Sequence, residues 1–159
     1  MVSDEEIGFP TGHADERELL LNWLRYLRGA VLRKVEDLSD DEARWTPEGR
    51  LLPLVGIVHH LTNVERRWID GGFLGAIVSR PDDELADVGH LTVADTAALY
   101  RLRGEATESA ARALSLTTPH PYGPAIDLRW VLLHLINETA RHAGHADAVR
   151  ELLDGTTGE

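Results

Sequence analysis

Ionisable side chains in the segment from residue 128 to 153 lie on the helix face that should be buried. At about 100° per residue, one arc of this segment contains Val131, His134, Glu138, His142, His145, Val149 and Leu152. The arc is apolar at both ends and ionisable in the middle. An uncompensated carboxylate inside a protein costs on the order of several kcal/mol. A divalent cation would compensate Glu138, and His142 lies one helical turn further on, where it can reach the same ion.

A second segment, from residue 54 to 68, offers a third ligand. Its apolar arc is centred on Leu61, with His60 at the edge and His59 roughly opposite. Periodicity therefore favours His60 as the inward ligand and leaves His59 outside. Glu65 is also predicted to face inward, where it would hydrogen-bond a ligating imidazole.

Other interpretations of the inner arc stay open at this stage. His145 or His134 would replace one of the ligands if the helix were rotated. A buried hydrogen-bonded network, or a helix face along a wet groove, would also explain these polar positions. Arg141 lies at the margin of the arc and is either a surface ion pair or a substrate contact.

The elements that must position these residues are helical. Apolar residues recur at three- and four-residue spacing over about 14–38, 53–71, 92–114 and 127–153, as one buried helix face requires. Between them lie stretches rich in proline, glycine and acids, and no segment alternates convincingly as a strand would. The pattern predicts an all-α four-helix bundle. We expect a single domain over residues 1–159, with flexible ends at about 1–12 and 155–159.

Composition excludes several classes of protein. The chain carries 27 acidic and 16 basic residues, a formal net charge of −11, which disfavours nucleic acid and anionic membrane surfaces as partners. It contains no cysteine, so it has no disulfide framework and no thiol nucleophile of its own. The acidic start of the chain is unlike a signal peptide. We therefore expect a cytoplasmic protein.

Two segments resemble a known group of proteins. They are LVGIVHHLTNVERRW at 54–68 and LRWVLLHLINETARHAGHAD at 128–147. Both are similar to motifs of the DinB-like superfamily, and most closely to an uncharacterised subfamily common in actinobacteria. That subfamily is related to mycothiol-dependent maleylpyruvate isomerases and thiol S-transferases. The resemblance covers about 16–158.

The resemblance implies an up-down-down-up bundle with a long crossover between helices two and three, assembled as a homodimer. It also implies a divalent-metal site, with zinc or nickel as the expected ion. Carried over to this sequence, the ligands are His60, Glu138 and His142.

These expectations lead to a functional hypothesis. A metal-dependent thiol S-transferase or isomerase would act on small electrophiles, with a small-molecule thiol of the mycothiol type as cosubstrate. The reacting group would be a thiol or a water brought to the metal, so no side chain is assigned a catalytic role. Glu65, His145, Arg141 and His134 are candidates for orienting ligands or touching substrate. The alternatives are a metal-dependent hydrolase and a non-enzymatic stress-response or binding protein stapled by its metal.

Overall fold

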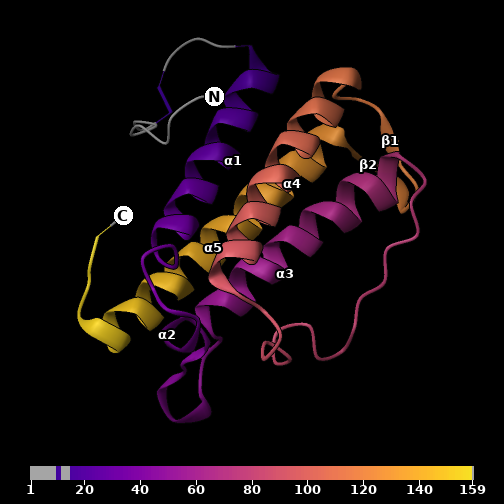
Figure 1. Cartoon of the computed structure of the whole chain (residues 1–159). Coiled ribbons are helices and arrows are strands. Elements are labelled where there is room, and N and C mark those ends of the chain that lie inside the picture. The colour runs from indigo at the N-terminus through magenta and orange to yellow at the C-terminus, as the bar shows by residue number, and fades with distance from the viewer. Residues whose placement is uncertain (1–9, 12–14, 159) are drawn as a thin grey trace.

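The computed structural model describes residues 10–11 and 15–158 and is mostly helical. Over those residues the α-helices are α1 (Glu16–Arg33), α2 (Asp40–Arg44), α3 (Leu54–Arg66), α4 (Val93–Ala113) and α5 (Leu128–Asp154). A 3-10 turn, η1 (Pro47–Gly49), precedes α3, and a π-helical segment, η2 (Arg67–Gly71), continues it. A small hairpin consists of β1 (Pro119–His120) and β2 (Gly123–Asp127). Figure 1 shows the long helices α1, α3, α4 and α5 lying side by side.

Side-chain caps define where three of the long helices begin. Asp15, Thr92 and Asp127 each accept a hydrogen bond from a backbone N–H in the first turn that follows. Such caps satisfy donors that have no partner within the helix. At the other end of α5, Gly155 adopts a left-handed conformation with φ of 76°, which a residue without a Cβ accommodates at little cost.

The structure corrects the sequence-based prediction at two places. The first helix was expected to continue to residue 38 but ends at Arg33, because Arg150 of α5 donates hydrogen bonds to the carbonyl of Lys34 and to the carboxylate of Asp37. A hairpin also forms where no strand was expected. Its first strand has only two residues, too few for an alternating pattern to show.

The core consists of two apolar clusters with a polar layer between them. One cluster includes Leu61 and Tyr100, and the other includes Leu24 and Leu135. Along α1, α3, α4 and α5 the residues at the level between the clusters include Arg28, Glu65, Thr107 and Thr139, all of them buried and polar. Glu138 and His142 lie at this same level of α5, between Leu135 and Ala146, so the candidate site adjoins the polar layer.

A long connection joins the end of η2 to the start of α4. It returns to the beginning of α3, where Leu85 and Val88 lie against Gly56 so closely that a Cβ there would come within 3.1 Å of both. The carbonyls of Val88 and Leu91 accept hydrogen bonds from Arg44. Figure 1 shows this connection running back along the molecule.

Two other expectations can be compared with the described residues. The predicted flexible end at 1–12 lies almost wholly outside them, and so does residue 159. No helix in the described part of the chain is long and apolar enough to cross a membrane.

Candidate metal centre

His60 from α3 and both Glu138 and His142 from α5 come together between these helices. Oε1 of Glu138 lies 3.3 Å from Nε2 of His60 and 3.2 Å from Nε2 of His142. The two imidazole centroids are 4.9 Å apart. One potential ligand atom from each of the three residues lies within 4.8 Å of the others. The structure thus brings together the residues that the sequence predicted to be ligands.

A carboxylate from the long connection orients His60. Oε1 of Glu84 lies 2.8 Å from Nδ1 of His60. Arg67, in η2, donates hydrogen bonds from its two terminal nitrogens to the oxygens of Glu84, at 2.7 Å and 3.2 Å. Burial opposes ionisation of Glu84, but the hydrogen bonds from Arg67 and His60 outweigh it and hold its pKa below the ordinary value. Glu84 is therefore an anion, and its carboxylate accepts a hydrogen bond from Nδ1–H of His60.

This hydrogen bond determines what His60 presents to the site. A neutral imidazole that donates from Nδ1 has a lone pair at Nε2. Nε2 of His60 lies 3.3 Å from the carboxylate oxygen of Glu138. Two electron-rich atoms at this distance need a cation or a proton between them. A carboxylate–histidine pair behind a metal ligand is the usual arrangement in protein metal sites.

The other two side chains are in the protonation states that a metal requires. Burial raises the pKa of Glu138, but hydrogen bonds and the nearby imidazoles His60 and His142 outweigh this effect and keep the pKa below its ordinary value. Burial, followed by the neighbouring His60, lowers the pKa of His142. At neutral pH the site therefore offers a carboxylate and a neutral imidazole, which are both metal ligands.

The donor set fits a divalent transition metal. Two imidazoles and one carboxylate suit zinc, nickel and similar ions. Three protein ligands leave room for a water or a substrate at the ion, which distinguishes catalytic sites from closed structural ones. Nδ1 of His142 is buried and has no hydrogen-bond partner among the described residues.

Glu65 does not have the role that the sequence predicted. Its carboxylate oxygens accept hydrogen bonds from Arg28 at 2.7 Å and 2.9 Å, and Thr107 donates a further one at 2.7 Å. Glu65 is buried as predicted, but it compensates the buried Arg28. The contact to a ligand imidazole belongs to Glu84.

The remaining candidates surround the site without joining it. The ring of His145 stacks on that of His142, with 6.4 Å between the ring centroids. Nε2 of His145 accepts a hydrogen bond from the backbone N–H of Leu52. His134 lies one turn before Glu138 and stacks on Trp130 at 5.3 Å. Arg141 is exposed. Neither His145 nor His134 belongs to the group of possible ligands in the described residues.

Sequence reasoning missed Glu84. The residue follows Asp82 and Asp83 in a stretch rich in acids, and such a stretch resembles a solvated surface loop. Only the return of the connection to α3 buries this one carboxylate, to 7% exposure. Periodicity carries no signal for a contact of this kind.

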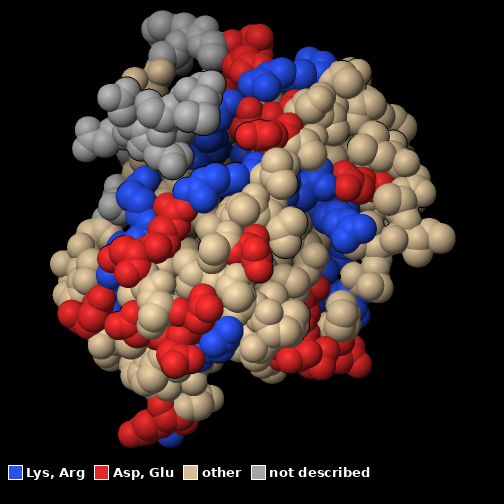
Figure 2. Space-filling view, viewed as in Figure 1, with Lys and Arg blue, Asp and Glu red and all other residues tan. Residues whose placement is uncertain are grey.

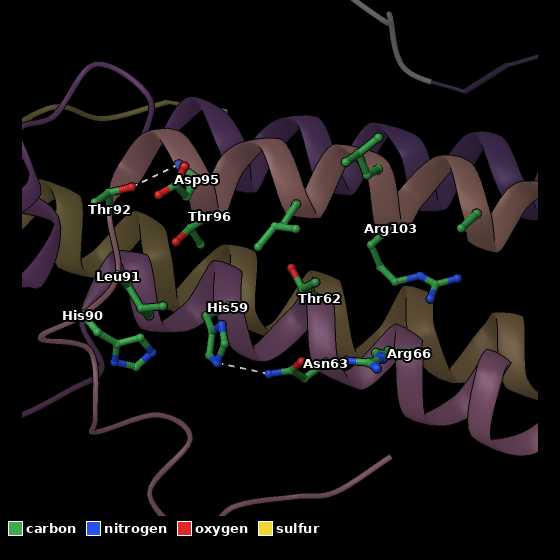
Figure 3. Close-up of a pocket in the computed structure, with 13 residues that line it drawn as sticks. His59, Thr62, Asn63, Arg66, His90, Leu91, Thr92, Asp95, Thr96 and Arg103 are labelled. Atoms are coloured by element: carbon green, nitrogen blue, oxygen red, sulfur yellow. Dashed lines mark hydrogen bonds between the residues drawn. The ribbon is translucent and has the colours of Figure 1, made fainter. Parts of the chain in front are cut away.

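A cavity of about 540 Å³ lies elsewhere, between α3 and α4. His59 lines it, and none of the three candidate ligands does. Figure 3 shows His59, Asn63 and Arg66 along α3, with α4 on the opposite side. The cavity and the candidate metal centre are therefore two separate features on different sides of α3.

The chain matches one protein family over most of its length. Residues 19–155 match the Mycothiol-S-transferase family, and the chain belongs to it. This confirms the relationship inferred from the two motifs. A comparison with curated proteins finds no match.

Proposed function

We propose that this protein is a metal-dependent mycothiol S-transferase whose metal is held by His60, Glu138 and His142. The observation that carries the proposal is the convergence of one ligand atom each from His60, Glu138 and His142 within 4.8 Å of one another, with Glu84 contacting the other ring nitrogen of His60. Membership of the Mycothiol-S-transferase family supports the thiol as substrate. The lack of any cysteine in the chain agrees with a sulfur nucleophile that comes from a small molecule.

The chemistry assigns a task to each side chain. A divalent ion at this site would lower the pKa of a thiol that binds to it and so supply a thiolate at neutral pH. Glu138 provides the negative charge of the site, and His142 provides a neutral nitrogen donor. Glu84 and Arg67 hold His60 in one tautomer and one orientation.

The transfer itself forms one sulfur–carbon bond. The sulfur supplies the electron pair for the bond to the electrophilic carbon, and the thiol proton passes to solvent. A leaving group departs with the electrons of its own bond, or, on addition to a conjugated double bond, a proton from solvent is taken up at carbon. The step needs no oxidant or reductant.

Several finer features are part of the same proposal. Zinc or nickel is the expected ion, given the nitrogen and oxygen donors. The return of the long connection to the start of α3 supports the up-down-down-up order of the bundle. A single domain over the whole chain, a homodimer and a cytoplasmic location stay predictions, and sedimentation of the purified protein tests the dimer.

A thiol-conjugation assay tests the function. The protein, purified without chelator, is incubated with mycothiol and monochlorobimane, and its metal content is measured by elemental analysis. We expect metal-dependent conjugation above the uncatalysed rate. His60→Ala should abolish both activity and bound metal, whereas His59→Ala, at the neighbouring position on another side of α3, should retain both.

Other results would overturn the proposal in different ways. Thiol-independent hydrolysis of an activated ester, lost with the metal, would make the protein a hydrolase. Bound metal without activity toward any thiol or ester would mean that the ion has a structural role only. Equal loss of metal in His59→Ala and His60→Ala would contradict the ligand assignment.

A further inference from the structure

The cavity between α3 and α4 has the size of a small-molecule site. Its volume of about 540 Å³ falls within the range of roughly 300–1,000 Å³ typical of ligand pockets. His59 lines it, while His60, the next residue, faces the candidate metal centre. Successive side chains on a helix point about 100° apart, so the backbone of α3 separates the two sites.

One wall of the cavity is aliphatic and exposed. Leu99 and Leu102 of α4 are 57% and 61% exposed, and Ala106 extends the same wall. Leucine side chains of this size gain free energy when they leave water. A ligand with an apolar body would cover both of them.

The opposite wall, from α3, is polar and uncharged over most of its length. Nδ2 of Asn63 lies 3.1 Å from Nε2 of His59, and Thr62 donates a hydrogen bond to the carbonyl of Val58. This wall offers hydrogen-bonding groups that carry no fixed charge.

Charge is concentrated at the two ends of the cavity. Arg66 is exposed and makes no ion pair with any residue that the structure describes. Arg103 reaches the same end from α4, as Figure 3 shows, but its guanidinium is paired with Asp70 at 2.6 Å. Asp95 lies near the other end, in the first turn of α4. An anionic group is therefore favoured beside Arg66 and disfavoured beside Asp95.

The surface around this end agrees with an anionic ligand. Figure 2 shows basic side chains near the boundary between α4 and α3, with acidic side chains beside them and uncharged surface of α4 next to them. The whole chain has a net charge of −11, so a local basic group is not a consequence of its composition.

We propose that the cavity binds a small amphipathic carboxylate, with its anionic group at Arg66 and its apolar body against Leu99 and Leu102. The proposal is independent of the metal and of the transferase activity, because no residue of the cavity belongs to the metal centre. It gives the protein a second ligand site on another side of α3.

Octanoate is a suitable probe, with octanamide as its uncharged analogue. The full-length protein is titrated with each, and the backbone amide resonances are followed by NMR. We expect saturable shifts at Asn63, Arg66 and Leu102 with octanoate, and about tenfold weaker binding of octanamide, as the loss of a charge-assisted hydrogen bond would give.

Variants make the assignment specific. Arg66→Gln should weaken octanoate binding about tenfold, whereas Arg50→Gln, at an exposed position outside the cavity, should leave it unchanged. His60→Ala should also leave it unchanged, which separates this site from the metal centre.

Three outcomes would overturn the proposal. The first is the absence of saturable octanoate binding. The second is equal affinity for octanoate and octanamide, which would remove the role of Arg66. The third is a concentration-dependent shift of the same amides without ligand, together with a dimer in sedimentation, which would make this face an interface between copies of the chain.

Discussion

Nδ1 of His60 lies 2.8 Å from Oε1 of Glu84, a residue 24 positions further along the chain. This contact joins α3 to the middle of the long connection. It also determines which nitrogen of His60 is free to bind a metal. The orientation of a ligand in the bundle therefore depends on the conformation of a segment outside the helices.

Replacing Glu84 with glutamine should weaken metal binding. The amide keeps the size of the side chain but lacks the negative charge. It is therefore a weaker hydrogen-bond acceptor for Nδ1–H of His60 and forms no ion pair with Arg67. Removing such a partner of a ligand typically lowers metal affinity by about 10–100-fold. Competition with a chromophoric chelator measures the change.

Asp83→Asn is the matched control for that variant. It makes the same change of charge at the preceding residue, which is exposed. We expect its metal affinity to equal that of the unmodified protein. Equal weakening in both variants would mean that the net charge of the connection, and not the contact to His60, determines affinity.

The candidate ligands could be predicted from sequence because the fixed rotation per residue in a helix determines which side chains share a face. Positions 138 and 142 share a face at any depth in the bundle, and the apolar neighbours of His60 show which way that face turns. Glu65 illustrates the limit of this reasoning. Its burial was predicted correctly, but its partner was not, since Arg28 lies on another helix and no periodicity relates the two.

Metal binding should weaken in acid. A proton and a metal ion compete for the same imidazole nitrogen. Burial, together with the positive charge that His60 carries when protonated, keeps the pKa of His142 below its ordinary value of 6.5. The neutral, metal-binding form therefore dominates above pH 6.5 and is lost as the pH falls through the lowered pKa.

Affinity measured between pH 8 and 5 checks this expectation. We expect little change from pH 8 to 7 and a decrease below 6.5, by about tenfold per pH unit for each proton that the metal displaces. A decrease that begins above pH 7.5 would show that protonation of His142 is not depressed in the folded protein.

Glu65 should contribute to stability and not to metal binding. In Glu65→Gln the guanidinium of Arg28, 7% exposed, loses its closest counter-charge and keeps only the longer contact to Glu108 at 3.3 Å. Breaking a buried pair by neutralising one partner costs on the order of 3 kcal/mol. Urea unfolding measures this loss, with Glu105→Gln on the exposed side of α4 as the control.

The metal content of the folded Glu65→Gln protein completes that test. It should match the content of the unmodified protein, because the carboxylate of Glu65 is fully used by Arg28 and Thr107. Loss of metal with unchanged stability would indicate that Glu65 orients a ligand imidazole, as the sequence predicted.

The fold was easier to predict than its irregular parts. Apolar spacing is a local property, and it predicted the starts of α1, α4 and α5 closely. The early end of α1 depends on Arg150, more than 100 residues away along the chain. Contacts of this kind arise only from the assembled structure.

A pair of glycine substitutions tests the packing at the end of η2. A Cβ on Gly72 would lie 2.1 Å from Nε2 of His120. That ring is 4% exposed and contacts Trp68, Phe73 and Tyr122, so it has little room to move. Gly72→Ala should therefore destabilise the protein by about 1–3 kcal/mol, as overpacking does.

Gly144→Ala should have the opposite sign. Gly144 lies inside α5, and a Cβ there would meet nothing within 4 Å. Alanine in a helix interior is favoured over glycine by about 0.5–1 kcal/mol, so thermal unfolding should move to higher temperature. If Gly72→Ala were also stabilising, His120 would have to leave its place among the aromatic rings, and the packing of the hairpin against η2 would be contradicted.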